Sequence, residues 1–128
     1  MSRRILVADD EPHVLRVLIH SLERQGYEVQ AVGNGVDAFE RVMQVAPDVL
    51  ITDISMPKMD GRMLCQRVQE ALPDRQFLIF ILTSRTEIEH REWSAALPNV
   101  QFLEKPVSTR KLLNRLKEYF AFRDGAVV

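Results

Sequence analysis

The sequence predicts an α/β domain built on a parallel sheet that helices cover on both faces. Five short apolar runs rich in branched residues are each about the length of a buried strand, at residues 5–8, 29–32, 49–51, 77–82 and 100–103. Segments with helical spacing of apolar residues follow each run. This fivefold alternation favours a doubly wound parallel sheet, because parallel strands need a crossover connection that is usually a helix.

The segments between the runs have apolar residues every three or four positions, as amphipathic helices do. The clearest stripes are Val14, Leu15, Leu18 and Leu22; Val36, Phe39, Val42 and Met43; Met63, Leu64, Val68 and Leu72; and Leu112, Leu113, Leu116 and Phe120. The first three are followed by Gly26, Pro47 and Pro73, residues typical of helix ends. Ser108 or Thr109 is expected to cap the last helix. The segment 87–97, the expected fourth helix, has the least regular stripe.

The composition indicates one globular domain, residues 1–128, and no output domain is expected in this chain. Its 128 residues are 46% hydrophobic and 27% charged, which excludes a disordered chain. A formal net charge of −1 gives no positive field for direct binding to nucleic acid or to a membrane surface. The single Cys65, expected to be a packing residue, excludes an intramolecular disulfide, and the longest apolar run is too short to span a bilayer. We therefore expect a cytoplasmic protein.

Reactive side chains follow the expected strands at their carboxyl ends, where open parallel sheets bind ligands. They are Asp9 and Asp10 after the first strand, Asp53 after the third, Thr83 and Ser84 after the fourth, and Glu104 and Lys105 after the fifth. Two carboxylates about 4 Å apart repel by about 4 kcal/mol at an effective dielectric near 20, so the cluster must bind protons or cations. Mg²⁺ fits best, because no convergent Cys or His favours zinc, and His13, His20 and His90 are scattered.

A metal ion, the Lys105 ammonium and the Thr83 hydroxyl would together suit a phosphoryl group. Asp53 stands alone after its strand, whereas Asp9 and Asp10 are adjacent. We therefore predict that Asp53 is the nucleophile and that the pair holds the metal. Taken alone, the stretch Asp9-Asp10-Glu11-Pro12 could equally be a charge cluster at the start of a helix. The placement of all five residues at the ends of four strands favours the functional interpretation.

These residues resemble the receiver domain of bacterial two-component response regulators, in particular single-domain, chemotaxis-type regulators. The resemblance covers about residues 4–122 and depends on Asp9-Asp10, Asp53, Met56-Pro57-Lys58-Met59-Asp60-Gly61, Thr83 and Lys105-Pro106. It implies a flavodoxin-like (βα)5 fold with strand order 2-1-3-4-5. It also implies a phosphorylation-activated switch of a phosphorelay, not an enzyme beyond its own phosphorylation and dephosphorylation. The phosphoryl donor would be a sensor histidine kinase or a histidine phosphotransfer protein.

The resemblance also implies roles for individual residues. Asp53 would accept the phosphoryl group, and Asp10, Asp53 and the backbone carbonyl of Ser55 would ligate Mg²⁺. Asp9 would act through a metal-bound water. Lys105 would contact the phosphoryl group, and the bond between Lys105 and Pro106 would be cis.

Thr83 and Phe102 occupy the switch positions of the family, and both would move toward the phosphorylated site. The output would pass through the face formed by the fourth helix, the fifth strand and the fifth helix. Trp93, Tyr119 and Phe122 are candidate partner contacts there, with Trp93 expected to be partly exposed because it lies off the apolar stripe. The same face could form a homodimer; the downstream protein partner is left open.

Three positions depart from the family pattern. Ser84 follows Thr83 where Ala or Gly is usual, which could narrow access to the site. Pro98-Asn99 replaces a common Gly-Ala pair, so an unusual loop is expected there. Arg85 and Ser55 occupy the variable positions that influence phosphoryl lifetime. We hypothesise that Arg85 reaches over the aspartyl phosphate and hinders water; the alternative is a solvated surface arginine.

Two other functional interpretations remain open. The chain could be a receiver excised from a longer regulator with a DNA-binding or enzymatic output domain. It could also be a small flavodoxin-like cofactor-binding protein or a phosphatase. A flavin or dinucleotide site would need a Gly-rich or hydroxyl-rich loop after the first strand, where this chain has Asp-Asp-Glu-Pro. A phosphatase would need insertions that the short connections do not provide.

Overall fold

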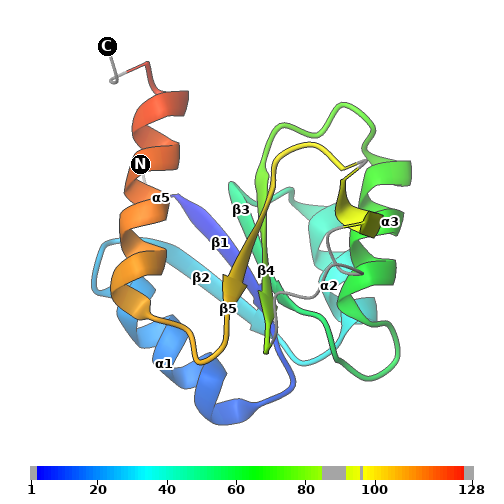
Figure 1. The fold of residues 1–128 in the computed structure, drawn as a ribbon, viewed down its shortest axis with the longest axis horizontal. Helices are drawn as coiled ribbons and strands as arrows, with labels where there is room; N and C mark the ends of the chain where they lie inside the picture. The colour runs from blue at the N-terminus through cyan, green and yellow to red at the C-terminus, as the bar shows by residue number, and fades with distance from the viewer. Residues whose placement is uncertain (1–2, 85–91, 96, 126–128) are drawn as a thin grey trace.

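The computed structural model describes residues 3–84, 92–95 and 97–125. Its elements in chain order are β1 (Arg4–Ala8), α1 (Pro12–Glu23), β2 (Glu28–Val32), α2 (Gly35–Gln44), β3 (Val49–Asp53), α3 (Gly61–Ala71), β4 (Leu78–Thr83), β5 (Val100–Glu104) and α5 (Thr109–Arg123). The strands form one parallel sheet in the predicted order β2-β1-β3-β4-β5. Helices α1 and α5 cover one face and α2 and α3 the other (Figure 1). This is the predicted flavodoxin-like architecture. Within the expected fourth helix, residues 92–94 are helical, and 85–91 and 96 lie outside the described residues.

The core consists of two apolar layers, one on each face of the sheet. One layer joins Leu18 and Leu22 of α1 to Leu112 and Leu116 of α5. The other layer includes the buried residues of α2 and α3, among them Cys65, which is a packing residue as predicted. Because β1, β3 and β4 face a layer on each side, they are apolar along most of their length. No helix among the described residues has the length and hydropathy needed to cross a membrane.

Local sequence signals set the helix ends. Helix α1 stops at Glu23, and Gly26 turns the chain toward β2 with a φ of 90°, in the left-handed region that glycine tolerates. Of the two residues predicted to cap α5, Ser108 is the N-cap. Its Oγ accepts a hydrogen bond of 3.2 Å from the backbone N–H of Lys111. The side chain of Asp60 caps α3 in the same way.

The loop before β5, where Pro98-Asn99 departs from the family pattern, is held by a buried arginine. Arg75 is only 6% exposed, and its guanidinium donates hydrogen bonds to the backbone carbonyls of Phe77, Pro98 and Asn99 and to the side chain of Gln69. Burial lowers the pKa of Arg75. Asn99 itself has a φ of 53°, which asparagine tolerates better than most residues. The interactions fasten the amino ends of β4 and β5 together, at the end of the sheet opposite the aspartates.

Candidate functional site

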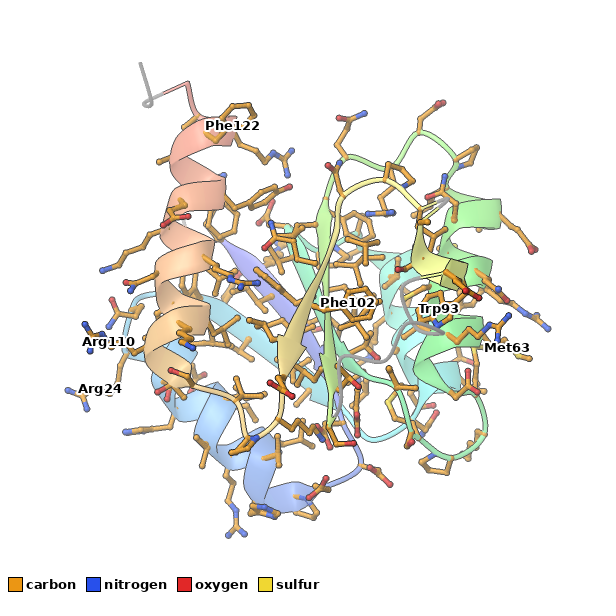
Figure 2. The ribbon with its side chains drawn as sticks, in the orientation of Figure 1. Arg24, Met63, Trp93, Phe102, Arg110 and Phe122 are labelled. Carbon is orange, nitrogen blue, oxygen red and sulfur yellow. The ribbon has the colours of Figure 1, made fainter. Side chains whose placement is uncertain are left out.

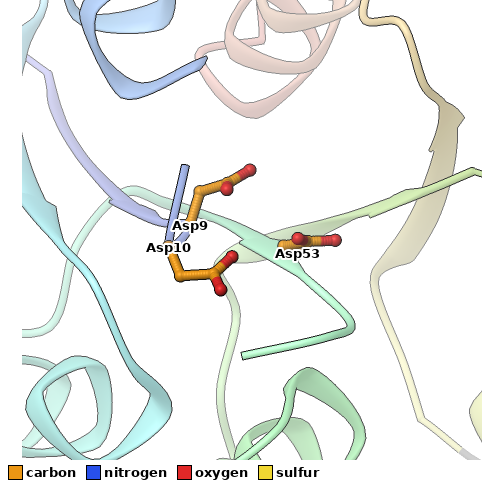
Figure 3. A group of neighbouring side chains, drawn as sticks. All are labelled: Asp9, Asp10 and Asp53. Carbon is orange, nitrogen blue, oxygen red and sulfur yellow. The ribbon is translucent and has the colours of Figure 1, made fainter. Parts of the chain in front are cut away.

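Three aspartates meet at the carboxyl ends of β1 and β3, which are neighbours in the sheet (Figure 3). Asp9 and Asp10 follow β1, and Asp53 is the last residue of β3. One carboxylate oxygen of each lies within 4.8 Å of the other two. Asp9 and Asp53 are buried, whereas Asp10 is exposed. An all-oxygen set of carboxylates on an accessible edge fits a hard divalent cation such as Mg²⁺.

Lys105, just beyond β5, places its ammonium among these acids. Its Nζ lies 3.1 Å from Oδ2 of Asp9 and 3.1 Å from Oδ2 of Asp53. A third carboxylate, from Glu11, lies 3.3 Å away. Burial alone would lower the pKa of Lys105, but the hydrogen bonds with Asp53 and Asp9 outweigh it and raise that pKa. The amine is therefore a lasting positive charge beside three carboxylates, and Asp10 adds a fourth acid to the cluster.

The Asp53 carboxylate is oriented through both of its oxygens. Oδ1 accepts a hydrogen bond of 2.8 Å from the backbone N–H of Ile54, and Oδ2 faces Lys105. Burial raises the pKa of Asp53, while Lys105 and the Ile54 N–H counteract part of that rise. The Thr52 hydroxyl donates to the Asp53 carbonyl at 2.9 Å.

Asp9 differs from its neighbour Asp10 in burial and in partners. It is 0% exposed, and its Oδ1 accepts a hydrogen bond of 2.9 Å from the backbone N–H of Glu11. Its Oδ2 faces Lys105 at 3.1 Å. Both oxygens of Asp9 are therefore engaged within the protein, whereas Asp10 extends its carboxylate toward solvent.

The loop after β3 packs tightly against the start of α3. The N–H of Gly61 donates to the Ile54 carbonyl at 2.7 Å. A Cβ on Gly61 would lie only 2.2 Å from the carbonyl oxygen of Asp53. Ser55, two residues after Asp53, is exposed on this loop.

Thr83, at the end of β4, and Lys105, just after β5, lie at the same edge of the sheet as the aspartates. Thr83 ends β4 and is 3% exposed, and its carbonyl accepts a hydrogen bond of 2.6 Å from the backbone N–H of Lys105. The bond between Lys105 and Pro106 is cis, as the resemblance implied. Ser84 is exposed beside Thr83, and Arg85 and His90 lie outside the described residues. The structure thus gathers Asp9, Asp10, Asp53, Thr83 and Lys105 at one edge.

Phe102 and Trp93 pack against each other (Figure 2). Their rings meet edge to face, with centroids 6.4 Å apart. Both side chains are half-buried, so the expected partial exposure of Trp93 is confirmed. Tyr119 is also half-buried, and its hydroxyl donates to the Gln76 carbonyl at 3.1 Å. Of the three candidate partner contacts, Phe122 is the most open, at 75% exposed.

The contact between Glu11 and Lys105 is not predicted by the sequence. In the sequence, Glu11 is only one residue of an acidic stretch before an expected helix. Its backbone caps α1, and its side chain reaches the amine from β5, 94 residues away in sequence. The only indication of this contact in the sequence is that Glu11 is a third acid directly after Asp9 and Asp10, the pair predicted to bind a cation.

Comparison with known proteins identifies relatives along nearly the whole chain. The family model of the response regulator receiver domain matches residues 5–117. The response regulator receiver protein CpdR of Brucella abortus is 35% identical over 116 residues, which cover 91% of this chain and 95% of CpdR. The alkaline phosphatase synthesis transcriptional regulatory protein PhoP of Bacillus subtilis is 31% identical over 117 residues, 91% of this chain and 48% of PhoP.

Among solved structures, the chemotaxis response regulator CheY4 of Vibrio cholerae superimposes with a TM-score of 0.84 at 27% identity. The match covers 92% of this chain and 98% of CheY4. The chain spans about half the length of PhoP and nearly all of CpdR. Fold, strand order and family model agree, and the chain therefore belongs to the receiver domains of two-component response regulators, which are signalling switches rather than ordinary enzymes.

Proposed function

We propose that this domain is a phosphorylation-activated switch whose phosphoacceptor is Asp53. The observation that carries the proposal is the Asp53 carboxylate, 3.1 Å from the Lys105 ammonium at the edge of an acidic cluster. Receiver domains interact with histidine kinases or histidine phosphotransfer proteins. We propose that a phosphohistidine on such a partner donates the phosphoryl group.

The transfer uses an oxygen of Asp53 as nucleophile. That oxygen attacks the phosphorus of the phosphohistidine, so that a P–O bond forms as the P–N bond breaks. The imidazole of the donor leaves with the electron pair of the broken bond and takes up a proton from water. Lys105, held in place by Asp9, donates to the phosphoryl oxygens as negative charge develops on them.

Asp10, Asp53 and the backbone carbonyl of Ser55 are proposed to ligate Mg²⁺ directly, with Asp9 acting through a water. The donor atoms are all oxygens, the class that Mg²⁺ prefers. An indirect role for Asp9 is supported by its two oxygens, which already accept hydrogen bonds from Glu11 and Lys105. When bound, the ion would neutralise charge on the phosphoryl oxygens and on the acids.

Thr83 and Phe102 are proposed to convert phosphorylation into a surface change. An aspartyl phosphate adds strong hydrogen-bond acceptor oxygens. A shift of about 100-fold toward the active conformation requires about 2.7 kcal/mol of differential interaction free energy. Hydrogen bonds from Thr83 and Lys105 to ionised oxygens could supply it, at about 1.5–3 kcal/mol each. Phe102 packs on Trp93, so a movement of Phe102 would alter that contact. Trp93, Tyr119 and Phe122 are the proposed partner or homodimer contacts.

Two further proposals concern the extent of the unit and the lifetime of the phosphoryl group. Residues 1–128 are proposed to form one receiver domain. Arg85 and Ser55 are proposed to set how long the aspartyl phosphate survives, Arg85 by hindering water. An unchanged dephosphorylation rate in Arg85→Ala would contradict that role.

Intact-mass measurement after incubation with acetyl phosphate and Mg²⁺ tests the phosphoacceptor. We expect one labile phosphoryl group on the wild type and none on Asp53→Asn or without Mg²⁺. The exposed Asp74 provides a matched control, because Asp74→Asn makes the same chemical change in the loop before β4, at the edge of the sheet opposite the aspartates. Labelling of Asp53→Asn, or failure of the folded wild type with both acetyl phosphate and a phosphohistidine donor, would overturn the proposal.

A further inference from the structure

Glu11 is a fourth acid of the cluster and contacts Lys105. It is the N-cap residue of α1, and its backbone N–H donates to Oδ1 of Asp9 at 2.9 Å. This hydrogen bond places the Glu11 side chain beside the amine, with Oε1 3.3 Å from Nζ. The other oxygen, Oε2, lies 3.8 Å from Nε2 of His13.

The Lys105 ammonium has three N–H donors and faces three carboxylates. Two of those carboxylates are buried, with side-chain exposures of 0% for Asp9 and 10% for Asp53. The Glu11 side chain is 48% exposed, and its contact of 3.3 Å is the longest of the three. Before the P–O bond forms, a phosphoryl oxygen can therefore gain a donor from Lys105 only if one of these carboxylates gives it up. The contact of Glu11 with Lys105 costs the least free energy to break, because water can solvate the exposed carboxylate.

We propose that Glu11 is a positioning residue that slows phosphorylation by occupying the Lys105 donor that the phosphoryl group requires. It acts through Lys105 and contacts neither the reacting oxygen nor the phosphorus. The inference rests on the phosphoacceptor role proposed for Asp53. It adds to that role a group, Glu11, whose contact with Lys105 competes with the contact that the phosphoryl group needs.

The first test compares rates of acetyl phosphate labelling in Glu11→Gln and the wild type. The substitution keeps the shape of the side chain and removes its charge, so an exposed ion pair worth up to about 1 kcal/mol is lost and labelling should be about two- to fivefold faster. Glu23→Gln, the same change at the other end of α1, should label at the wild-type rate. A faster reaction is informative, because damage to the fold would slow it. An unchanged or slower rate would overturn the proposal.

A second comparison separates competition for the amine from simple charge repulsion. In a Lys105→Gln background, Glu11→Gln should no longer accelerate labelling, since the contact that it releases is absent. An acceleration that persists in full in this background would assign the effect to repulsion of the anionic donor and would refute the role through Lys105.

A third readout needs neither metal nor phosphoryl donor. Acetic anhydride modifies free amines, and peptide mass spectrometry gives the acylation rate at Lys105 alone. Glu11→Gln should raise that rate by about the same two- to fivefold, since the amine loses an exposed ion pair. An unchanged rate would overturn the inference. If the wild type takes no phosphoryl group at all, the proposed function fails, while this measurement still decides whether Glu11 restrains Lys105.

Discussion

Replacing Gly61 with alanine should disturb the acidic site through the backbone. Gly61 opens α3, and a Cβ there would lie 2.2 Å from the Asp53 carbonyl oxygen and 2.9 Å from Cα of Ile54. Contacts under 3.0 Å are essentially never seen for a Cβ, so the start of α3 or the end of β3 must move. Overpacking of this kind costs about 1–3 kcal/mol, of which about 0.4–1 kcal/mol is regained because alanine restricts the unfolded chain. We therefore expect a net loss of up to about 2.6 kcal/mol in the free energy of unfolding.

Gly33→Ala is the matched control, because a Cβ at Gly33 would meet nothing within 4 Å. Urea unfolding should show a lower free energy of unfolding for Gly61→Ala and an unchanged or slightly higher one for Gly33→Ala. Since the displaced backbone carries Asp53, the folded Gly61 variant should also take up phosphoryl groups more slowly from acetyl phosphate. Equal midpoints and equal labelling rates in the two variants would refute the close contact and its link to the site.

Three further predictions concern stability and reactivity. Arg75→Ala should lower the free energy of unfolding by about 2–5 kcal/mol, because the buried carbonyl of Phe77 and the partly buried carbonyl of Pro98 lose this charged donor. A loss as small as that of the exposed Arg67→Ala, about 0.5 kcal/mol or less, would contradict this. Ser108→Ala should cost about 1 kcal/mol in urea unfolding through loss of the α5 cap, and unchanged stability would argue against the cap. Burial raises the pKa of Cys65 to about 12 from an ordinary 9.0, so at pH 9 a thiol reagent should label the protein only as fast as it unfolds. Because the unfolded thiol ionises first, the contribution of Cys65 to stability is intact below about pH 9 and falls between pH 9 and 12; rapid labelling of the native protein would contradict its burial.

The sheet could be predicted from sequence because strands buried on both faces are continuous apolar runs. The predicted runs 49–51 and 77–82 lie within two residues of the observed β3 and β4. Each strand continues into a polar residue, Asp53 or Thr83, because the ladder of backbone hydrogen bonds does not stop where hydrophobicity does. Asp53 and Thr83 are the strand residues that belong to the candidate site.

The gathering of the acids could likewise be predicted, but their pairing could not. Topology alone brings the residues after β1, β3 and β5 to one edge. Asp9 and Asp10 are identical in chemistry, yet Asp9 is buried against Lys105 and Asp10 is exposed, a difference that the sequence pattern does not report. The contact of Glu11 with Lys105 depends on the path of the chain into α1, which the apolar pattern does not report.

Polar interactions hold β5 at both of its ends. At the carboxyl end, the Lys105 N–H binds the Thr83 carbonyl, and the Lys105 side chain joins the acids. At the amino end, Arg75 holds the Asn99 carbonyl, which also accepts a hydrogen bond of 2.9 Å from the backbone N–H of Ile79. A strand fastened in this way cannot slide without breaking these hydrogen bonds, and the partly buried ones are costly to lose. The side chain between the two ends, Phe102, is held only by packing. A change at Asp53 is therefore expected to reach the surface through a rotation of Phe102 rather than a displacement of the strand.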